Sequence, residues 1–276
     1  MTIRAMTIKD LEIVLGWAAD EGWNPGLDDA AAFVAADPAG FLIKKVDDEP
    51  VAAISVVNHS PNFAFLGLYI CKPEYRGQGH GIDVWQAGIA HAGTRTIGLD
   101  GVPDQQENYA RSGFKKSGST VRYQGSIKAT SDPRIRPATP SELGVLVNRD
   151  AKATGIDRSV FSTAWLSPTP NRITLVLTDG AGIEGFATFR RCALGAKVGP
   201  LQATCEADAL SLLGANPFAR GNEPIYIDVQ GKDSKFSQLL EKQGFSPTFE
   251  TARMHKGPPP EATLTSYLAI ATMELG

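Results

Sequence analysis

The residues best suited to chemistry form a glycine-rich turn at 76–81, which reads Arg76-Gly77-Gln78-Gly79-His80-Gly81. The turn follows an apolar stretch at 67–71 and precedes a helical pattern at 82–92. Glycines let a backbone approach a ligand closely, and the unpaired N–H groups of a helix's first turn attract anions. The turn therefore predicts a binding site for a pyrophosphate group.

Two common pyrophosphate motifs do not match this turn. The Walker motif ends in Gly-Lys followed by Ser or Thr, and no such step follows a glycine here. The dinucleotide motif needs glycines spaced GxGxxG, whereas Gly77, Gly79 and Gly81 are spaced GxGxG and Ile82 follows them. An NTPase and a Rossmann-type enzyme are both disfavoured.

The turn resembles the acyl-CoA motif Arg/Gln-x-x-Gly-x-Gly/Ala of the GNAT superfamily of N-acetyltransferases. A second segment, Tyr109-Ala-Arg-Ser-Gly113-Phe114, is similar to the Tyr-x-x-x-Gly-Phe signature on the last helix of GNAT domains. The resemblance implies that acetyl-CoA is the acyl donor. It places the donor on ten residues: Tyr69, Ile70, Cys71, Arg76, Gly77, Gln78, Gly79, His80, Gly81 and Asn108.

The elements expected around these motifs follow the order of a GNAT domain. A Thr7 cap opens a helix at residue 8 after the first strand. Apolar spacing and turn residues then predict, in order, a helical piece at 28–36, strands at 41–46 and 51–57, a strand at 63–71, the helix at 82–92 and a strand at 96–100.

Proline and small polar residues at 126–140 mark a domain boundary. We expect two units, 1–130 and 131–276, because the strand-then-helix opening at 3–8 recurs from 135 and the segment 240–245 mirrors 109–114. The second unit lacks the glycine turn, and Leu240 stands where the first has Tyr109. The predicted fold is α/β with mixed sheets, as two tandem GNAT-like domains, the second degenerate and unable to bind acetyl-CoA. This arrangement, including the tail at 272–276, resembles a tandem GNAT subfamily with an intact first domain and a degenerate second domain.

The reaction implied is direct attack of an amine on the thioester within a ternary complex. A primary amine with a pKa of about 10.4 is mostly protonated at neutral pH, so a base must take its proton. Asp100 and Glu21 are the candidate bases, although Asp100 could be a turn residue and Glu21 a solvated surface charge. By the family motif, Tyr109 is the general acid for the CoA thiolate, and it could otherwise be a packing residue.

The acceptor site is expected at the loop that joins the first two helices. Glu21, Trp23 and Asn24 are the predicted acceptor-binding residues, with Trp23 alternatively a loop anchor. The second unit could close this pocket through its segments 199–201 and 249–254. Cys71 is not expected to be a nucleophile, because no paired histidine and acid accompany it.

Composition limits the partners. The 276 residues carry a net charge of −3 without a basic run, which disfavours nucleic acid. Three widely spaced cysteines imply no disulfide framework and no metal site. We expect a cytoplasmic protein without a membrane span or signal peptide, acting on a small-molecule amine. The alternatives are an acetyl-CoA sensor without transfer activity and a protein N-acetyltransferase.

Overall fold

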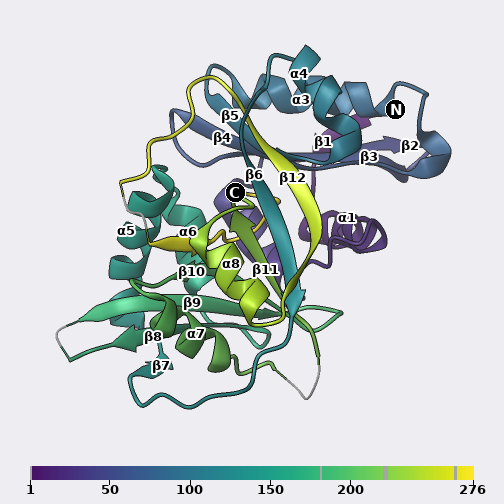
Figure 1. Cartoon of the computed structure of the whole chain (residues 1–276). Helices are drawn as coiled ribbons and strands as arrows, with labels where there is room; N and C mark the ends of the chain where they lie inside the picture. The colour runs from purple at the N-terminus through teal and green to yellow at the C-terminus, as the bar shows by residue number, and fades with distance from the viewer. Residues whose placement is uncertain (1, 181, 220–222, 264–265) are drawn as a thin grey trace.

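The structure, a computed structural model, describes residues 2–180, 182–219, 223–263 and 266–276. In these residues thirteen strands form one mixed, twisted sheet that runs through the entire molecule (Figure 1). Helices cover its faces, so the predicted α/β architecture is confirmed. None of the helices in the described ranges is long and apolar enough to cross a membrane.

The first half of the chain contains ten helices and strands, in the order expected of a GNAT domain. They are β1 (Thr2–Ala5), α1 (Ile8–Asp20), α2 (Asp29–Ala36), β2 (Phe41–Val46), β3 (Glu49–Asn58), β4 (Phe63–Cys71), α3 (His80–Ala92), β5 (Thr96–Gly101), α4 (Gln106–Arg111) and β6 (Lys115–Gly125). Helix α3 begins at His80, two residues earlier than the spacing of apolar residues predicts.

The second half repeats this order element by element. It contains β7 (Ile135–Pro137), α5 (Leu143–Thr154), α6 (Ser159–Leu166), β8 (Arg172–Thr178), β9 (Ile183–Arg191), β10 (Ala196–Gln202), α7 (Glu206–Gly214), β11 (Ile225–Gln230), α8 (Lys235–Lys242) and β12 (Ser246–Lys256). A short strand, β13 (Tyr267–Ala269), follows, and then the tail segment, which we define as residues 272–276.

Capping residues explain where the helices start and stop. Thr7 caps α1 as predicted, in a reciprocal capping box in which its hydroxyl accepts from the Asp10 backbone N–H and Asp10 accepts from the Thr7 backbone. Helices α4 and α8 end alike: the N–H of Phe114 donates to the Tyr109 carbonyl at 3.0 Å, and that of Phe245 to the Leu240 carbonyl at 3.0 Å. The repeat seen in the sequence is therefore a repeat of local structure.

The two halves exchange their last strands. Strand β12 of the second half pairs with β5 of the first, while β6 of the first pairs with β11 of the second, and β6 and β12 pair with each other in the middle. Figure 1 shows β6 and β12 crossing the molecule side by side. The boundary proposed at residue 130 thus lies after a strand that is embedded in the sheet of the other half.

A second contact between the halves joins α2 to α6. The rings of Phe33 and Trp165 stack with centroids 5.8 Å apart. The buried carboxylate of Asp29 pairs with Arg172 at 3.1 Å and with Arg190 at 2.5 Å, and both guanidinium groups lie over the Trp165 ring. One hydrophobic core therefore includes residues from both halves.

Candidate active site

Strand β4 separates from its parallel neighbour β5 partway along its length. The register joins Leu66 to Leu99 and goes no further, although β4 continues to Cys71. On its other side, where it pairs with β3, β4 contains a bulge. Gly67 pairs with Ser55 of β3, and the next residue of β4 that pairs with β3 is Ile70. The backbone from 67 to 71 therefore lies free of β5.

The bulge places Leu68 in a backbone conformation that leucine rarely adopts. Its φ of 44° lies in the left-handed region, although the residue is in a strand and buried. Such a conformation costs about 1–3 kcal/mol and is retained only where surrounding structure enforces it. Neither Leu68 nor Tyr69 has a partner in the β3 register. Main-chain groups are thus held rigidly beside a gap in the sheet.

The glycine turn lies at the end of this strand and opens α3. Gly77 and Gly79 have φ values of 76° and 85°, and Gly79 is the N-cap of α3. A Cβ at either position would meet nothing within 4 Å, so the space beside the turn is open. Arg76 donates to the Cys71 carbonyl at 2.9 Å and Gln78 to the Glu74 carbonyl at 2.9 Å. This open cradle with aligned N–H groups fits an anionic diphosphate.

His80 and Gly81 form the first turn of α3 behind this cradle. His80 is buried against the Tyr75 ring, and its Nδ1 has no hydrogen-bond partner in the described residues. A Cβ on Gly81 would lie 2.9 Å from the Tyr69 hydroxyl, so glycine at 81 leaves room for that ring. The side chains of Tyr69 and Trp85 contact each other with ring centroids 5.4 Å apart.

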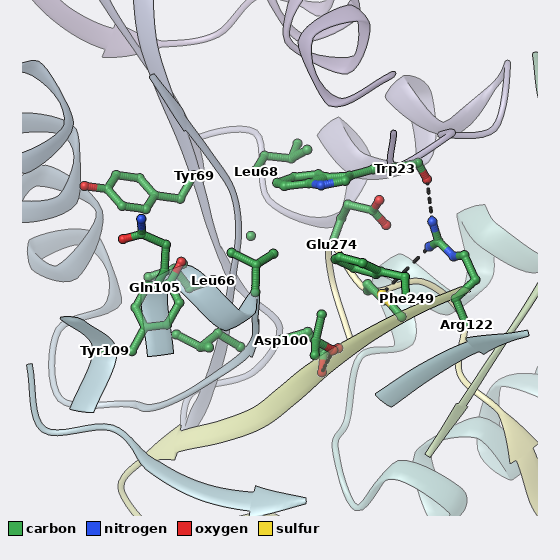
Figure 2. A pocket seen from close by; sticks show the side chains of 15 residues that line it. Trp23, Leu66, Leu68, Tyr69, Asp100, Gln105, Tyr109, Arg122, Phe249 and Glu274 are labelled. Atoms are coloured by element: carbon green, nitrogen blue, oxygen red, sulfur yellow. Dashed lines mark hydrogen bonds between the residues drawn. The ribbon is translucent and has the colours of Figure 1, made fainter. Parts of the chain in front are cut away.

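A cavity lies beside the bulge, between the two halves of the chain. It encloses about 600 Å³, including its opening to solvent. Side chains from β4, β5, β6, β12 and the tail segment line it, and most of them are apolar or aromatic (Figure 2). The ionisable side chains on its wall are Tyr69, Asp100, Tyr109, Arg122 and Glu274. A second hollow between α3 and α4, which includes the predicted donor residue Asn108, shares Tyr69, Gln105 and Tyr109 with this cavity.

Tyr109 projects from α4 where the two hollows meet. Its ring stacks on Trp85 with centroids 5.7 Å apart, and its hydroxyl has no hydrogen-bond partner among the residues described. Burial, with a smaller effect of Tyr69, raises the pKa of Tyr109 well above its usual range. The hydroxyl is therefore a neutral hydrogen-bond donor at any physiological pH, and Tyr109 lies on α4, the last helix of the first half.

Asp100 lies on the cavity wall, but its carboxylate is already occupied. Arg253 contacts it with both Nε and Nη2, at 3.0 and 2.7 Å. The hydroxyls of Thr120 and Thr251 donate to its Oδ1 at 2.9 and 3.3 Å. A carboxylate with four donors is poorly placed to accept another proton. The geometry favours a structural role for Asp100 over the predicted role as base, because it joins β5 to β6 and β12.

The loop between α1 and α2 contributes one residue to the cavity, and not three. Trp23 lines it, and its carbonyl accepts from Arg122 at 2.8 Å and Lys197 at 2.7 Å. The Asn24 side chain instead bonds the backbone of Leu194, which anchors the loop to the second half. Glu21 is exposed and pairs with Arg76 at 2.6 Å, outside the cavity. These positions do not favour acceptor contact by Glu21 or Asn24.

The tail segment supplies cavity residues to which the sequence assigned no role. It is buried along its length, with Leu275 in the core and its carbonyl bonded to His59 Nε2 at 2.9 Å. Arg158, fully buried and paired with Asp150, donates to the Gly276 carbonyl. So anchored, the segment presents Glu274 to the cavity. The sequence carried two signals: the tail at 272–276 resembled that of the tandem GNAT subfamily, and Glu274 is the single charge in an apolar run from 267 to 276.

The corresponding gap in the second half is filled. Strand β10 leaves β11 after Val198, just as β4 leaves β5, but β13 pairs with β10 at Leu201 and Gln202. The N–H of Ile270 donates to the Asp228 carbonyl on β11 at 2.9 Å. The segment 199–201 therefore contacts residues 269–271 and does not line the cavity, whereas Phe249 and Thr251 do.

The start of α7 also differs from that of α3. Its N-cap is Cys205 in extended conformation, and its first turn carries the acids Glu206 and Asp208. Negative charge at a helix N-terminus repels an anionic ligand. Within the described ranges, no group of three or more His, Cys, Asp or Glu could hold a metal ion.

Comparison with known proteins finds two family matches in the chain. Residues 9–114 match the acetyltransferase (GNAT) family, and residues 146–267 match an acetyltransferase (GNAT) domain. The chain is also similar to a holothin acyltransferase of Pseudoalteromonas sp. (strain SANK 73390). The identity is 33% over 281 residues, which cover 100% of this chain and 94% of the relative.

Solved structures share the fold across both halves. A proposed acetyltransferase of Pyrococcus horikoshii superposes with a TM-score of 0.81 at 22% identity, covering 100% of this chain and 95% of the other. A tandem GNAT protein from the clavulanic acid biosynthesis pathway has a TM-score of 0.62 at 14% identity, with 93% and 99% covered. The tandem arrangement predicted from the internal repeat is confirmed.

Proposed function

This chain belongs to the GNAT acetyltransferase family and is an acyltransferase, and from that premise we propose that it transfers an acetyl group from acetyl-CoA to an amine of a small molecule. The observation that carries the proposal is that the unpaired backbone of β4 and the free hydroxyl of Tyr109 lie along two hollows that share residues, with the open glycine cradle at the end of β4.

The donor would bind with its diphosphate at the turn 76–81 and its thioester beside the β4 bulge. The N–H groups at the start of α3 favour an anion there. Main-chain groups of residues 67–71, which β5 leaves unpaired, are available to the pantetheine arm. A rigid backbone N–H directed at the thioester oxygen would stabilise the oxyanion by a few kcal/mol, because such a donor needs no reorganisation during the reaction.

Tyr109 would assist the departure of CoA. A thiol of pKa about 8.5 is a stronger acid than a phenol, and more so here because burial raises the pKa of Tyr109. Complete proton transfer from Tyr109 to the thiolate is therefore uphill. We assign to its hydroxyl a hydrogen bond to the sulfur as negative charge develops, with the final proton supplied by solvent.

Only the first half would bind a donor. In the second half β13 and the residues up to 271 fill the gap between β10 and β11, and acidic side chains lie at the start of α7. The second half would instead complete the acceptor cavity. It does so through Phe249, Thr251 and Glu274, and through its contacts with β6, the exchanged strand that carries Arg122.

The test measures donor binding and transfer separately. Calorimetry gives the affinity for acetyl-CoA, and release of free CoA thiol is then followed with amino acids, polyamines, arylalkylamines and holothin as acceptors. Holothin is included because the relative is named for it. Release that depends on an acceptor would support the proposal. Tight binding without release from any acceptor would overturn it in favour of a sensor. Propionyl-CoA and hexanoyl-CoA, assayed in parallel, test the choice of acetyl.

A further inference from the structure

Two carboxylates of the described residues line the cavity, and of these only that of Glu274 has an oxygen without a hydrogen-bond partner. Thr272 donates its hydroxyl to Oε2 of Glu274, and Oε1 has no hydrogen-bond partner among the described residues. The residue is only 4% exposed, yet Oε1 is not among the buried atoms that lack a partner, so it opens onto the cavity. Asp100, by comparison, has four donors.

The position of Glu274 is fixed from both sides. Its backbone lies against β4 at Gly67, where β4 has just left β5. The anchors of the tail segment, His59 and Arg158, hold the residues that follow it. A side chain so constrained loses little entropy when it engages a substrate, which is the requirement for a preorganised catalytic group.

Two buried cations, Arg122 and Lys197, lie near the carboxylate of Glu274. Burial by itself lowers the pKa of Arg122, but Asp228 and Glu274 more than offset this, so that the pKa is raised and the guanidinium stays charged. Lys197 is buried, which lowers its pKa, and Arg122 adds to this, whereas Glu274 and Asp228 oppose the shift. Both cations therefore lie close enough to Glu274 to interact with it electrostatically.

Apart from Arg122, the wall near Glu274 is apolar, and two of its side chains carry flat aromatic rings. In Figure 2 the Glu274 side chain lies between the indole of Trp23 and the ring of Phe249. Leu68 and Met273 complete this part of the wall. Arg122 and Lys197 hold the Trp23 carbonyl, so the indole is a fixed surface. Aromatic faces of this kind favour flat apolar groups and cations.

We propose that Glu274 is the catalytic base of the transfer, and that Trp23 and Phe249 hold the flat, apolar body of the acceptor amine. This rests on the proposed function. The ammonium group of the acceptor first passes one proton to Glu274 Oε1, and Glu274 releases it to solvent. The neutral amine nitrogen then forms a bond to the thioester carbon, and the C–S bond breaks as the sulfur takes the bonding electron pair. The nitrogen passes its second proton to Glu274 and so to solvent, and the thiolate gains one from solvent, so that one proton is released overall and the charges balance.

The decisive variants are Glu274→Gln and Glu274→Ala, with Glu250→Gln as the matched control. Glu250 adjoins Phe249 on β12 but is exposed and faces Lys232 at 3.7 Å. Wild type must first transfer acetyl to an acceptor, and its failure would overturn the proposed function. Given transfer, Glu274→Gln should lower kcat/KM for basic arylalkylamines 100-fold or more, with melting temperature and CoA affinity unchanged, because general bases contribute roughly 10²–10⁴-fold.

Two further readouts separate a base from a structural residue. Glu274→Gln should lose less activity towards weakly basic amines, which are neutral at the assay pH, than towards basic amines. Formate should restore part of the activity of Glu274→Ala, since it can occupy the vacated space and take the proton, and it should not affect Glu250→Gln. Activity of Glu274→Gln within threefold of wild type would overturn the proposal. So would a loss that formate does not relieve and that accompanies a lower melting temperature.

Discussion

Gly67 on β4 and Glu274 in the tail segment touch backbone to backbone. A Cβ built on Gly67 would lie 2.2 Å from the Glu274 carbonyl oxygen, closer than real Cβ contacts come. Gly67 is also the residue at which β4 parts from β5. The absence of a side chain there allows a segment from the second half to lie against the donor strand, and so sets the position of Glu274 relative to the proposed thioester site.

Gly67→Ala should therefore displace the tail segment. We expect a loss of about 1–3 kcal/mol in the free energy of unfolding, as for other overpacked sites, and at least a tenfold loss of kcat. Chemical denaturation and CoA release measure the two. Gly16→Ala is the control, because Gly16 lies inside α1 with nothing within 4 Å of a Cβ. It should stabilise by about 0.5–1 kcal/mol. Full activity in Gly67→Ala would contradict the contact.

Tyr109→Phe should reduce turnover and leave CoA affinity nearly unchanged. The hydroxyl has no partner within the described part of the chain, so its removal leaves no unpaired group and the ring still stacks on Trp85. A hydrogen bond to developing negative charge in a dry site gives about 10–10³-fold in kcat. Single-turnover kinetics with calorimetry distinguishes the two effects. A kcat equal to that of wild type would remove Tyr109 from the mechanism.

Gly79→Trp should abolish donor binding, since the indole would fill the open space beside the cradle and force a bulky residue into a positive φ. Cys205→Trp is the matched substitution, because Cys205 is the exposed N-cap of α7, the counterpart of α3. We expect acetyl-CoA affinity to fall at least 100-fold in the first variant and to be unaffected in the second. Equal losses would mean that the second half also binds a donor.

The sequence was sufficient for the family, the order of elements and the repeat, because these depend on local patterns. Glycines with positive φ, the Thr7 cap and the matching ends of α4 and α8 are all determined by neighbouring residues. The correspondence of Leu240 with Tyr109 follows from spacing alone. Motif residues could accordingly be assigned to the correct elements from the sequence.

The acceptor side could not be predicted in this way, because it depends on contacts between distant residues. Glu274 reaches the cavity only because β12 inserts beside β5 and the chain returns across Gly67. Asp100 looked like a free carboxylate, and nothing local indicated that Arg253, 153 residues away, would pair with it. Glu21 and Asn24 adjoin Trp23 in sequence but face other partners.

Acidification should destabilise the fold through two buried histidines. Burial lowers the pKa of His59 to about 4, and burial with Arg253 lowers that of His255 to about 4. Between pH 6.5 and 4 the unfolded chain binds protons that the folded chain does not, so stability is complete above about pH 6.5 and is lost as the pH falls. The loss is on the order of 1–2 kcal/mol per histidine at pH 5.

Urea denaturation at pH 7.5, 6 and 5 measures this dependence. His59→Gln should be less stable than wild type at pH 7.5, where the ring is neutral and well packed, but should show a shallower decline with acid. The His255 ring contacts the Ser117 hydroxyl at 2.8 Å and is independent of His59. The contribution of His255 to the pH dependence of stability should therefore persist in His59→Gln. An unchanged slope in His59→Gln would show that this histidine titrates alike in both states.

The exchange of β6 and β12 implies that the halves depend on each other for folding. In a fragment 1–130, β6 would lose both its neighbours, β11 and β12, and β5 would lose the strand that covers its edge. Unpaired backbone and the apolar side chains of Val121 and Tyr123 would be exposed, which favours aggregation. We expect neither 1–130 nor 131–276 to bind acetyl-CoA alone, and a 1:1 mixture refolded together to regain binding. Independent binding by 1–130 would mean that β6 can fold back onto β5, so that the exchange is a feature of the joined chain and the two units are separable.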